Sequence, residues 1–289
     1  MDLVSKKRVG ILRGGDEAHY DASLRHGGDV LAHIFENLSD TYKTVDILVD
    51  KDGVWHANGM PILPSALVHK VDVVWNTGHP SLGQVVQHFS IPVVSVSSFS
   101  SNLANNRSML EEHMRGIGIE MPRHIPSPKN AREVFNKFPA PWIVRIILPD
   151  SNIVNVQVVK TLPELDSVIE DAALNNKNIL VEEFITGLVG AVHSVRGFRG
   201  QDIYTFPPEN LKADEKEKLM NVAKILHEYL GAQPYLKSNF ILAPRGKVYL
   251  TGILFTPNLK DGSHFSRSCE YVGAEMHHVI EHILEQARQ

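Results

Sequence analysis

Short apolar runs separated by polar segments dominate the first third of the chain. Four of these runs have the length of buried strands, namely residues 9–12, 45–49, 71–75 and 92–96. Between the first two runs, apolar residues recur at helical spacing from Leu24 to Leu38. Because strands that alternate with helices form parallel sheets with helices on their faces, residues 1–100 are predicted to form an N-terminal α/β subdomain.

The pattern changes after residue 100. A single helix is predicted over 103–115 because glycines follow it, and the proline-rich segment 122–128 is predicted to be a connector. Strand-like runs follow at 142–148, 153–159 and 179–185. The capping-box sequence Thr161-Leu-Pro-Glu164 predicts the start of a helix before the last of these runs. Residues 101–186 are therefore predicted to form a small α+β subdomain.

The last third, residues 187–289, is predicted to form a C-terminal subdomain with strands and two helices. The strand-like runs are 191–195, 203–206, 238–242 and 248–254. One helix is predicted over 214–230, with Gly231 as its stop, and the other ends the chain. The inward face of the first helix is predicted to consist of Leu219, Val222, Ala223, Ile225, Leu226 and Tyr229.

Composition narrows the class of protein. The 289 residues are 43% hydrophobic, which is typical of a soluble globular protein. With 29 basic and 33 acidic residues, the net charge of −4 gives no electrostatic reason to expect nucleic acid or a membrane as a partner. No apolar run approaches the ~20 residues needed to cross a bilayer, and a strand instead of a signal-peptide core follows residues 1–8, so a cytoplasmic location is expected. The single Cys269 excludes an internal disulfide and fits a reducing compartment.

The segment from Val9 to Leu24 is an apolar strand that breaks into Gly14-Gly15 before a polar helix start. It resembles the beginning of the D-alanine–D-alanine ligase family, which is part of the ATP-grasp superfamily. Further segments resemble the family in the same order, namely 116–122, 180–187, 249–257 and 272–274. The resemblance implies an ATP-grasp architecture of the α/β and α+β class. Its N-terminal parallel-sheet subdomain would precede two subdomains, 101–186 and 187–289, that hold ATP between antiparallel sheets.

The resemblance also implies a set of cofactor-binding residues. Arg107 and Arg145 fall where the family has two phosphate-binding lysines, and they keep the positive charge in a different geometry. Only Ser151 fits the pattern of the family's glycine loop. Glu182, the expected adenine acceptor, and its neighbours Glu183 and Phe184 fall on the adenine-binding hinge strand. A solvated strand end is the alternative interpretation of the two glutamates.

On the substrate side, the resemblance implies three catalytic residues. Ser23 is kept, His19 stands where a glutamate binds the first D-alanine, and Lys237 lies near the position of an arginine that stabilises the tetrahedral intermediate. The lid that excludes water is reduced to residues 207–210. A hydrolase triad of Ser23, His19 and Asp21 is disfavoured because neighbouring positions on one helix do not orient a base, and Ser23 is expected to cap that helix.

The magnesium positions of the family fall on Asn239, Gly252 (or Thr251, if the register slips by one) and Leu254. Two magnesium ions that bridge phosphates need a set of oxygen ligands, chiefly carboxylates. No carboxylate stands at these positions, so no metal ligand is predicted and magnesium is not expected.

The chain is rich in histidine, with 15 residues. His278 and His282, four residues apart on the last helix, could present two imidazoles to zinc, but surface or partly buried histidines are the preferred interpretation. His79 follows a strand end on the face where open α/β sheets bind ligands, which makes it a candidate polar site residue, with a plain turn as the alternative.

Three functions are consistent with these residues. Loss of the ligands, glycine loop and lid favours a degenerate ligase-like protein that acts in binding or scaffolding. The second is an active ATP-dependent D-alanine ligase of cell-wall precursor synthesis, with ligands relocated to Asp261, Glu182 or Glu183. The third is a nucleotide-binding module without turnover that uses Arg107, Arg145 and Glu182.

The resemblance implies ATP as the cofactor. A small molecule or a protein is expected as the ligand of the cleft. A homodimer is also expected, because ligases of this family are commonly dimers.

Overall fold

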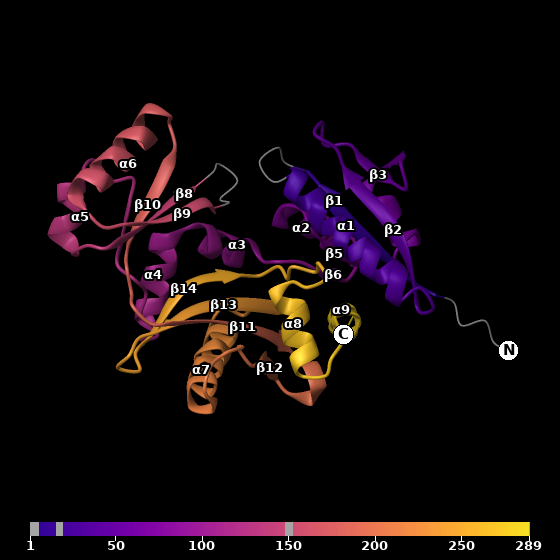
Figure 1. Ribbon diagram of the computed structural model, residues 1–289. Helices are drawn as coiled ribbons and strands as arrows, with labels where there is room; N and C mark the ends of the chain where they lie inside the picture. The colour runs from indigo at the N-terminus through magenta and orange to yellow at the C-terminus, as the bar shows by residue number, and fades with distance from the viewer. Residues whose placement is uncertain (1–5, 16–19, 148–152, 289) are drawn as a thin grey trace. The chain divides into compact units, whose positions relative to one another are not determined.

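The computed structural model describes residues 6–15, 20–147 and 153–288 (Figure 1). The chain divides into two compact units. The first consists of Met1–Ala104, Ala191–Ser238 and Ile253–Gln289, and the second of Asn105–Gly190 and Asn239–Gly252. The three subdomains predicted from the sequence, with bounds near residues 100 and 186, stay a prediction.

The first unit contains a sheet with the strand order β4-β3-β2-β1-β5-β6. Its strands are β1 (Lys7–Gly14), β2 (Tyr42–Val49), β3 (Trp55–Ala57), β4 (Met60–Ile62), β5 (Val73–Asn76) and β6 (Val93–Val94). The pairs β1–β2, β1–β5 and β5–β6 are parallel, which confirms the predicted parallel sheet. The antiparallel hairpin β3–β4 was not predicted, because strands of three residues are too short to show a periodicity.

Four helical segments accompany this sheet. They are α1 (Tyr20–Asn37), the 3₁₀ segment η1 (Pro64–His69), α2 (Pro80–His88) and α3 (Ser98–Asn105). The buried face of α1 consists of Ser23, Gly27, Val30 and Ile34, at the spacing of a helical stripe. The prediction that Ser23 caps this helix is wrong. Ser23 lies inside α1, and its Oγ accepts a hydrogen bond of 2.9 Å from the backbone N–H of Gly14, which ties the end of β1 to the helix.

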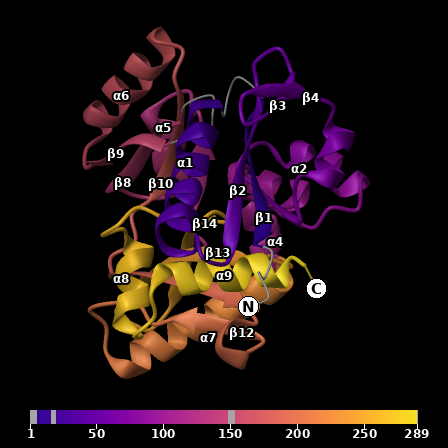
Figure 2. The same cartoon turned by 90° about the vertical axis from the view of Figure 1, so that its right-hand side faces the viewer.

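The core of the first unit joins residues from both ends of the chain. Val9, Ile34, Val279 and Ile283 belong to one buried cluster. Elements from the later part of the chain that contribute to it include η2 (Phe198–Gly200), α8 (His264–Tyr271) and α9 (Met276–Gln286). Figure 2 shows α8 and α9 next to each other. No described helix combines the length and apolar character needed to cross a bilayer.

Helix α7 (Ala213–Tyr229) ends where predicted, with Gly231 in the left-handed conformation just after it. Its buried face differs from the prediction. Ile225 and Tyr229 are exposed to 51% and 43%, and His227 is buried instead. The buried side of α7 is a stripe with spacings of four, three and one residues, namely Leu219, Ala223, Leu226 and His227. Ile225 and Tyr229 lie outside this stripe and therefore point away from the core.

The second unit contains an antiparallel sheet with the order β7-β10-β8-β9. Its strands are β7 (His124–Pro126), β8 (Trp142–Ile147), β9 (Ile153–Val159) and β10 (Asn178–Glu183). Helices α5 (Ala131–Lys137) and α6 (Leu162–Leu174) pack on one face of it through a buried cluster that includes Trp142, Val144 and Val181 (Figure 1). β7 was missed because it lies in the proline-rich segment that was predicted to be a connector.

Side-chain caps set the helix starts of this unit. The helix predicted over 103–115 is broken at Asn106, whose side chain accepts a hydrogen bond of 3.0 Å from the N–H of Met109 and begins α4 (Arg107–Gly116). Thr161 caps α6 as predicted, by accepting from the N–H of Glu164. The carboxylate of Glu164 accepts from the N–H of Lys160 at 2.9 Å, one residue before the cap.

The remaining sheet has the order β12-β11-β13-β14. Its strands are β11 (Leu188–Arg196), β12 (Ile203–Phe206), β13 (Tyr235–Leu242) and β14 (Val248–Leu254), and each contains one of the predicted runs. Strands β11, β13 and β14 include residues of both units.

Candidate functional site

One face of the sheet in the second unit carries charged side chains among apolar ones. In the strand register, Glu182 of β10 stands opposite His124 of β7 and Ile143 of β8. Arg145 lies two residues further along β8, so it is the diagonal neighbour of Glu182 on the same face. Because successive side chains of a strand point to opposite faces, Val181 of β10 packs into the core, while Glu182 lies on the face that carries a polar cluster.

Glu182 is the centre of this cluster, and only 2% of it is exposed. Its Oε1 forms an ion pair of 2.6 Å with Nη2 of Arg107, and its Oε2 accepts a hydrogen bond from Nε of Arg145. Arg107 also donates from Nη1 to the backbone carbonyl of Thr251 at 2.9 Å. The solvated strand end considered above is therefore wrong for Glu182.

The three charges do not cancel. Burial lowers the pKa of the Arg107 guanidinium, the Glu182 carboxylate offsets part of that effect, and Arg145 adds to the lowering. An arginine remains protonated even so, because its pKa lies above 12 in water. The Arg107–Glu182–Arg145 cluster, called the ion triad below, therefore carries one net positive charge.

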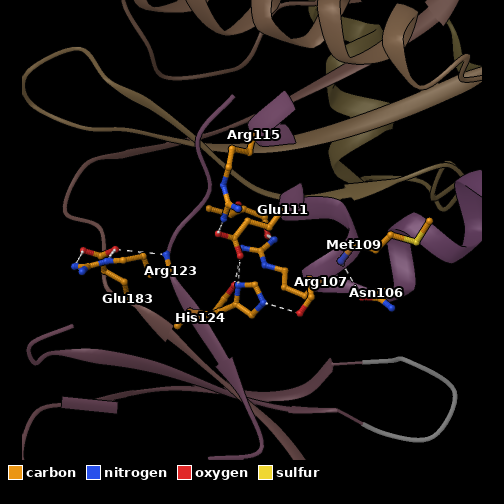
Figure 3. Close-up of polar contacts among 11 residues, drawn as sticks. Asn106, Arg107, Met109, Glu111, Arg115, Arg123, His124 and Glu183 are labelled. Atoms are coloured by element: carbon orange, nitrogen blue, oxygen red, sulfur yellow. Dashed lines mark hydrogen bonds and ion pairs between the residues drawn. The ribbon is translucent and has the colours of Figure 1, made fainter. Parts of the chain in front are cut away.

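Further polar residues lie close to Arg107 (Figure 3). His124 contacts Oε2 of Glu111 through Nδ1 at 3.2 Å, and its Nε2 lies 3.3 Å from Oγ of Ser108. Glu111 also accepts from Arg115 at 2.8 Å. Burial lowers the pKa of His124, with a further lowering by Arg107, so this imidazole is neutral at pH 7.

Glu183 belongs to a different contact. It accepts two hydrogen bonds from Arg123, at 2.9 Å from Nε and 2.7 Å from Nη2, in a bidentate pair (Figure 3). Hydrogen bonding to Arg123 lowers the pKa of the Glu183 carboxyl group. Phe184 follows the end of β10 and is half-buried. The structure thus brings Arg107, Arg145 and Glu182 together and leaves Glu183 in a pair of its own.

Of the predicted catalytic residues, Ser23 and Lys237 are in the first unit. Ser23 is buried against Gly14, as described, and its Oγ lies 3.4 Å from Oγ1 of Thr77. Lys237 on β13 is half-buried, and burial lowers its pKa. Burial lowers the pKa of His193 and of His264, and the positive charge of Lys237 lowers both further. His19 and Ser151 lie outside the described residues.

The positions at which the resemblance predicts the family's magnesium ligands carry side chains that do not fit magnesium. Asn239 lies on β13, and Gly252 and Leu254 lie on β14. A Cβ atom built on Gly252 would be 3.9 Å from Nδ2 of Asn239, so these two positions are neighbours. One amide, a bare backbone and an aliphatic side chain do not supply the oxygen ligands of a divalent ion.

The histidine candidates have local roles. Nδ1 of His79 accepts from the N–H of Ser81 at 3.3 Å, so His79 caps α2. His282 contacts the backbone carbonyl of Arg196 at 2.8 Å, and His277 lies 3.2 Å from Glu275. In the described part of the chain, no three His, Cys, Asp or Glu residues are placed to hold a metal ion.

Three members of the polar cluster were missed from the sequence, namely Glu111, Arg123 and His124. The resemblance pointed to Arg107, Arg145 and Glu182, but it identifies none of the three missed partners. The partners come from β7 and α4, which the sequence shows as a connector and as part of a longer helix.

The sequence and the structure were compared with those of known proteins. No protein-family model matches the chain. A D-alanine–D-alanine ligase of Geobacter sulfurreducens is 26% identical over 89% of this chain and 86% of that ligase. The vancomycin/teicoplanin A-type resistance protein VanA of Enterococcus faecium is 21% identical over 97% of this chain and 98% of its own length. The VanG D-Ala:D-Ser ligase of Enterococcus faecalis superposes with a TM-score of 0.75 over 98% of this chain and 99% of that one.

The chain resembles the D-alanine–D-alanine ligase family over nearly its whole length. A D-alanyl-alanine synthetase of Vibrio cholerae, with a TM-score of 0.76 at 14% identity, also covers 98% of both chains. These matches confirm the predicted family and ATP-grasp fold. Because the matched structures are only 14% and 16% identical, they establish the architecture of the chain and not its activity.

Proposed function

We propose that this ligase-like ATP-grasp protein does not catalyse magnesium-dependent ligation and acts instead as a binding or scaffolding protein. The observation that carries the proposal is the ion triad. Both cations that would meet the phosphates of ATP are bound to one buried carboxylate, Glu182, and Arg107 is further held by the carbonyl of Thr251. Phosphate would have to displace Glu182 to reach them, against the cost of separating a buried ion pair.

The metal side supports the same proposal. Transfer of a phosphoryl group from ATP depends on divalent ions that neutralise the charge developing on the phosphate oxygens. Asn239, Gly252 and Leu254 provide none of the carboxylates that would hold such ions.

An active ligase whose magnesium ligands lie at other positions is less well supported. Of the candidate carboxylates, Glu182 is bound by two guanidinium groups and Glu183 by one. Asp261 is exposed in the segment between β14 and α8. An active D-alanine ligase of cell-wall precursor synthesis would have to release one of these ion pairs to gain a metal ligand.

A nucleotide-binding module without turnover is the second candidate, and one observation favours it. Val156 and Val158 of β9 stand opposite Arg145 and Ile143, on the face of the sheet that carries the triad. They are exposed to 50% and 44%, so an apolar surface lies beside a cationic cluster. Such a surface would suit an aromatic base with an anionic group attached.

The test is calorimetric titration of the full chain with ATP and with ADP, each with and without magnesium, together with an assay of phosphate release in the presence of D-alanine. We expect no phosphate release and no effect of magnesium on binding. Weak binding of ATP without magnesium would select the second candidate. Tight magnesium-dependent binding, or phosphate release that depends on D-alanine, would contradict both.

Two sets of substitutions test separately whether the ion triad or the missing magnesium ligands prevent binding of ATP with magnesium. Glu182→Gln frees both guanidinium groups, so ATP should bind several-fold more tightly if the triad blocks the phosphate site, and more weakly if Glu182 is the adenine acceptor. The triple substitution Asn239→Asp, Gly252→Glu and Leu254→Asn restores the ligand types of the family, and the open space at Gly252 can accept a side chain. A gain of magnesium-dependent ATP binding would identify the lost ligands as the cause. The homodimer and the cytoplasmic location stay predictions.

A further inference from the structure

A cavity of about 370 Å³ lies within the first unit, apart from the ion triad. It is enclosed by α2, the segment that follows β6, the end of β11 and the C-terminal end of α9. Its volume is in the range of small-molecule sites. Every residue that lines it belongs to the first unit.

The charge of this cavity is unusual. The residues that line it include Arg196 together with several serines and glutamines. Among the described residues that line it, none is acidic and none is another cation. The cavity therefore presents a single positive charge and many hydrogen-bonding groups.

Arg196 has no counterion in the described chain. Its Nε is buried and has no hydrogen-bond partner, and no described carboxylate lies within ion-pair distance of the guanidinium group. By contrast, Arg8 and Arg13 of the same unit form ion pairs with Asp72 and Asp46, at 2.7 Å and 2.6 Å. Partly buried cations in proteins are usually paired, so an unpaired one beside a cavity indicates an anionic ligand.

Three glutamine side chains near Arg196 can also form hydrogen bonds with a ligand. Gln87, Gln233 and Gln286 line the cavity, and no hydrogen bond joins their side-chain amides to a described residue. Val94, Phe255 and Ile283 provide apolar wall. The lining therefore combines one anion-binding group with neutral donors and an apolar surface.

We propose that this cavity binds a small organic anion with one carboxylate or phosphate group and no ammonium group. Arg196 pairs with the anionic group, and the amides of Gln87, Gln233 and Gln286 bind the polar remainder. An ammonium group is disfavoured because the lining offers no carboxylate to pair with it. This feature separates the site from one for D-alanine, and the proposal is independent of whether the protein ligates or binds nucleotide.

The test is titration of the full chain with four probes: pyruvate, glycerol 3-phosphate, inorganic phosphate and D-alanine. Calorimetry measures affinity, and the side-chain amide signals in a ¹⁵N correlation spectrum locate the site. We expect pyruvate or glycerol 3-phosphate to bind and to shift the signals of Gln87, Gln233 and Gln286, while the signal of Gln157 on β9 stays in place. Binding of pyruvate would identify a carboxylate site, and binding of glycerol 3-phosphate a phosphate site. Binding of inorganic phosphate alone would indicate an anion site without room for an organic ligand, against the proposal.

Arg196→Gln should lower the affinity of the bound probe roughly tenfold or more, because it removes a charge-assisted hydrogen bond. The matched control is Arg132→Gln, which removes an exposed guanidinium group from α5 and should leave affinity within about twofold. The spectral shifts need no variant, so they remain informative if Arg196→Gln fails to fold. The proposal is overturned if neither organic anion binds, if shifts occur elsewhere, or if D-alanine binds as tightly as the anions.

Discussion

Glu182 on β10 and Arg145 on β8 are diagonal neighbours across two antiparallel strands, and their side chains form an ion pair beneath α4. Arg107, the first residue of α4, contacts the second oxygen of the same carboxylate. The two cations that the resemblance predicts to bind phosphate thus share one protein carboxylate. This contact makes the proposal of a binding protein testable at a single residue.

The first prediction concerns the stability of the triad. Glu182→Gln leaves two neighbouring guanidinium groups partly buried without their carboxylate, so the free energy of unfolding should fall by about 3–5 kcal/mol. Glu183→Gln, the matched control on the next residue, breaks a pair whose Arg123 is 54% exposed. That change should cost about 1 kcal/mol or less. Urea unfolding measures both, and equal losses would show that the triad is no more stabilising than a surface pair.

The second prediction uses adjacent glycines of α1. A Cβ atom at Gly27 would lie 3.1 Å from Cβ and Cδ of Arg13 and from Oγ1 of Thr77, whereas one at Gly28 would meet nothing within 4 Å. Gly28→Ala should therefore stabilise the protein by roughly 0.5–1 kcal/mol through helix propensity alone. Gly27→Ala should be less stable than Gly28→Ala by about 1 kcal/mol or more, because helix and strand must move apart. Thermal unfolding of the two variants checks this, and equal midpoints would mean that the contact at Gly27 yields without cost.

The third prediction concerns acid stability. Burial, with a further contribution from Arg196, lowers the pKa of His227 to about 4. The native protein therefore keeps His227 neutral while the unfolded chain protonates it below its ordinary pKa, so stability falls as the pH drops from about 6.5 to 4. His227→Gln should reduce the slope of unfolding free energy against pH in this window by up to about 1.4 kcal/mol per pH unit. His69→Gln, at an exposed histidine, should leave the slope unchanged in urea titrations at pH 7, 6 and 5.

The fourth prediction concerns the single thiol. Cys269 is fully buried, and burial raises its pKa to about 12, with an additional effect of Glu270. Because the thiolate is the reactive form, Cys269 should not react with a disulfide reagent at pH 8 in the folded protein. One equivalent should react after denaturation. Rapid reaction of the native protein would show that α8 opens readily.

The sequence by itself determined the class of each main segment. Apolar runs of strand length, helical spacing and the cap at Thr161 predict most of the observed elements, and their order carries the resemblance to the ligase family. The parallel sheet of the first unit follows from the alternation of strands and helices. These features depend on local residue patterns, which the chain displays without folding.

The tertiary structure decided which charges meet. The sequence of β10 shows that Glu182 and Val181 lie on opposite faces, but it does not show whether water or protein covers Glu182. Arg107 and Arg145 precede Glu182 by 75 and 37 residues, and only strand register and the break at Asn106 bring them to its carboxylate. The same holds for Arg196, whose unpaired charge depends on segments from three distant parts of the chain. Electrostatic pairing acts over a few ångströms, so it follows from packing and cannot be inferred from the order of residues.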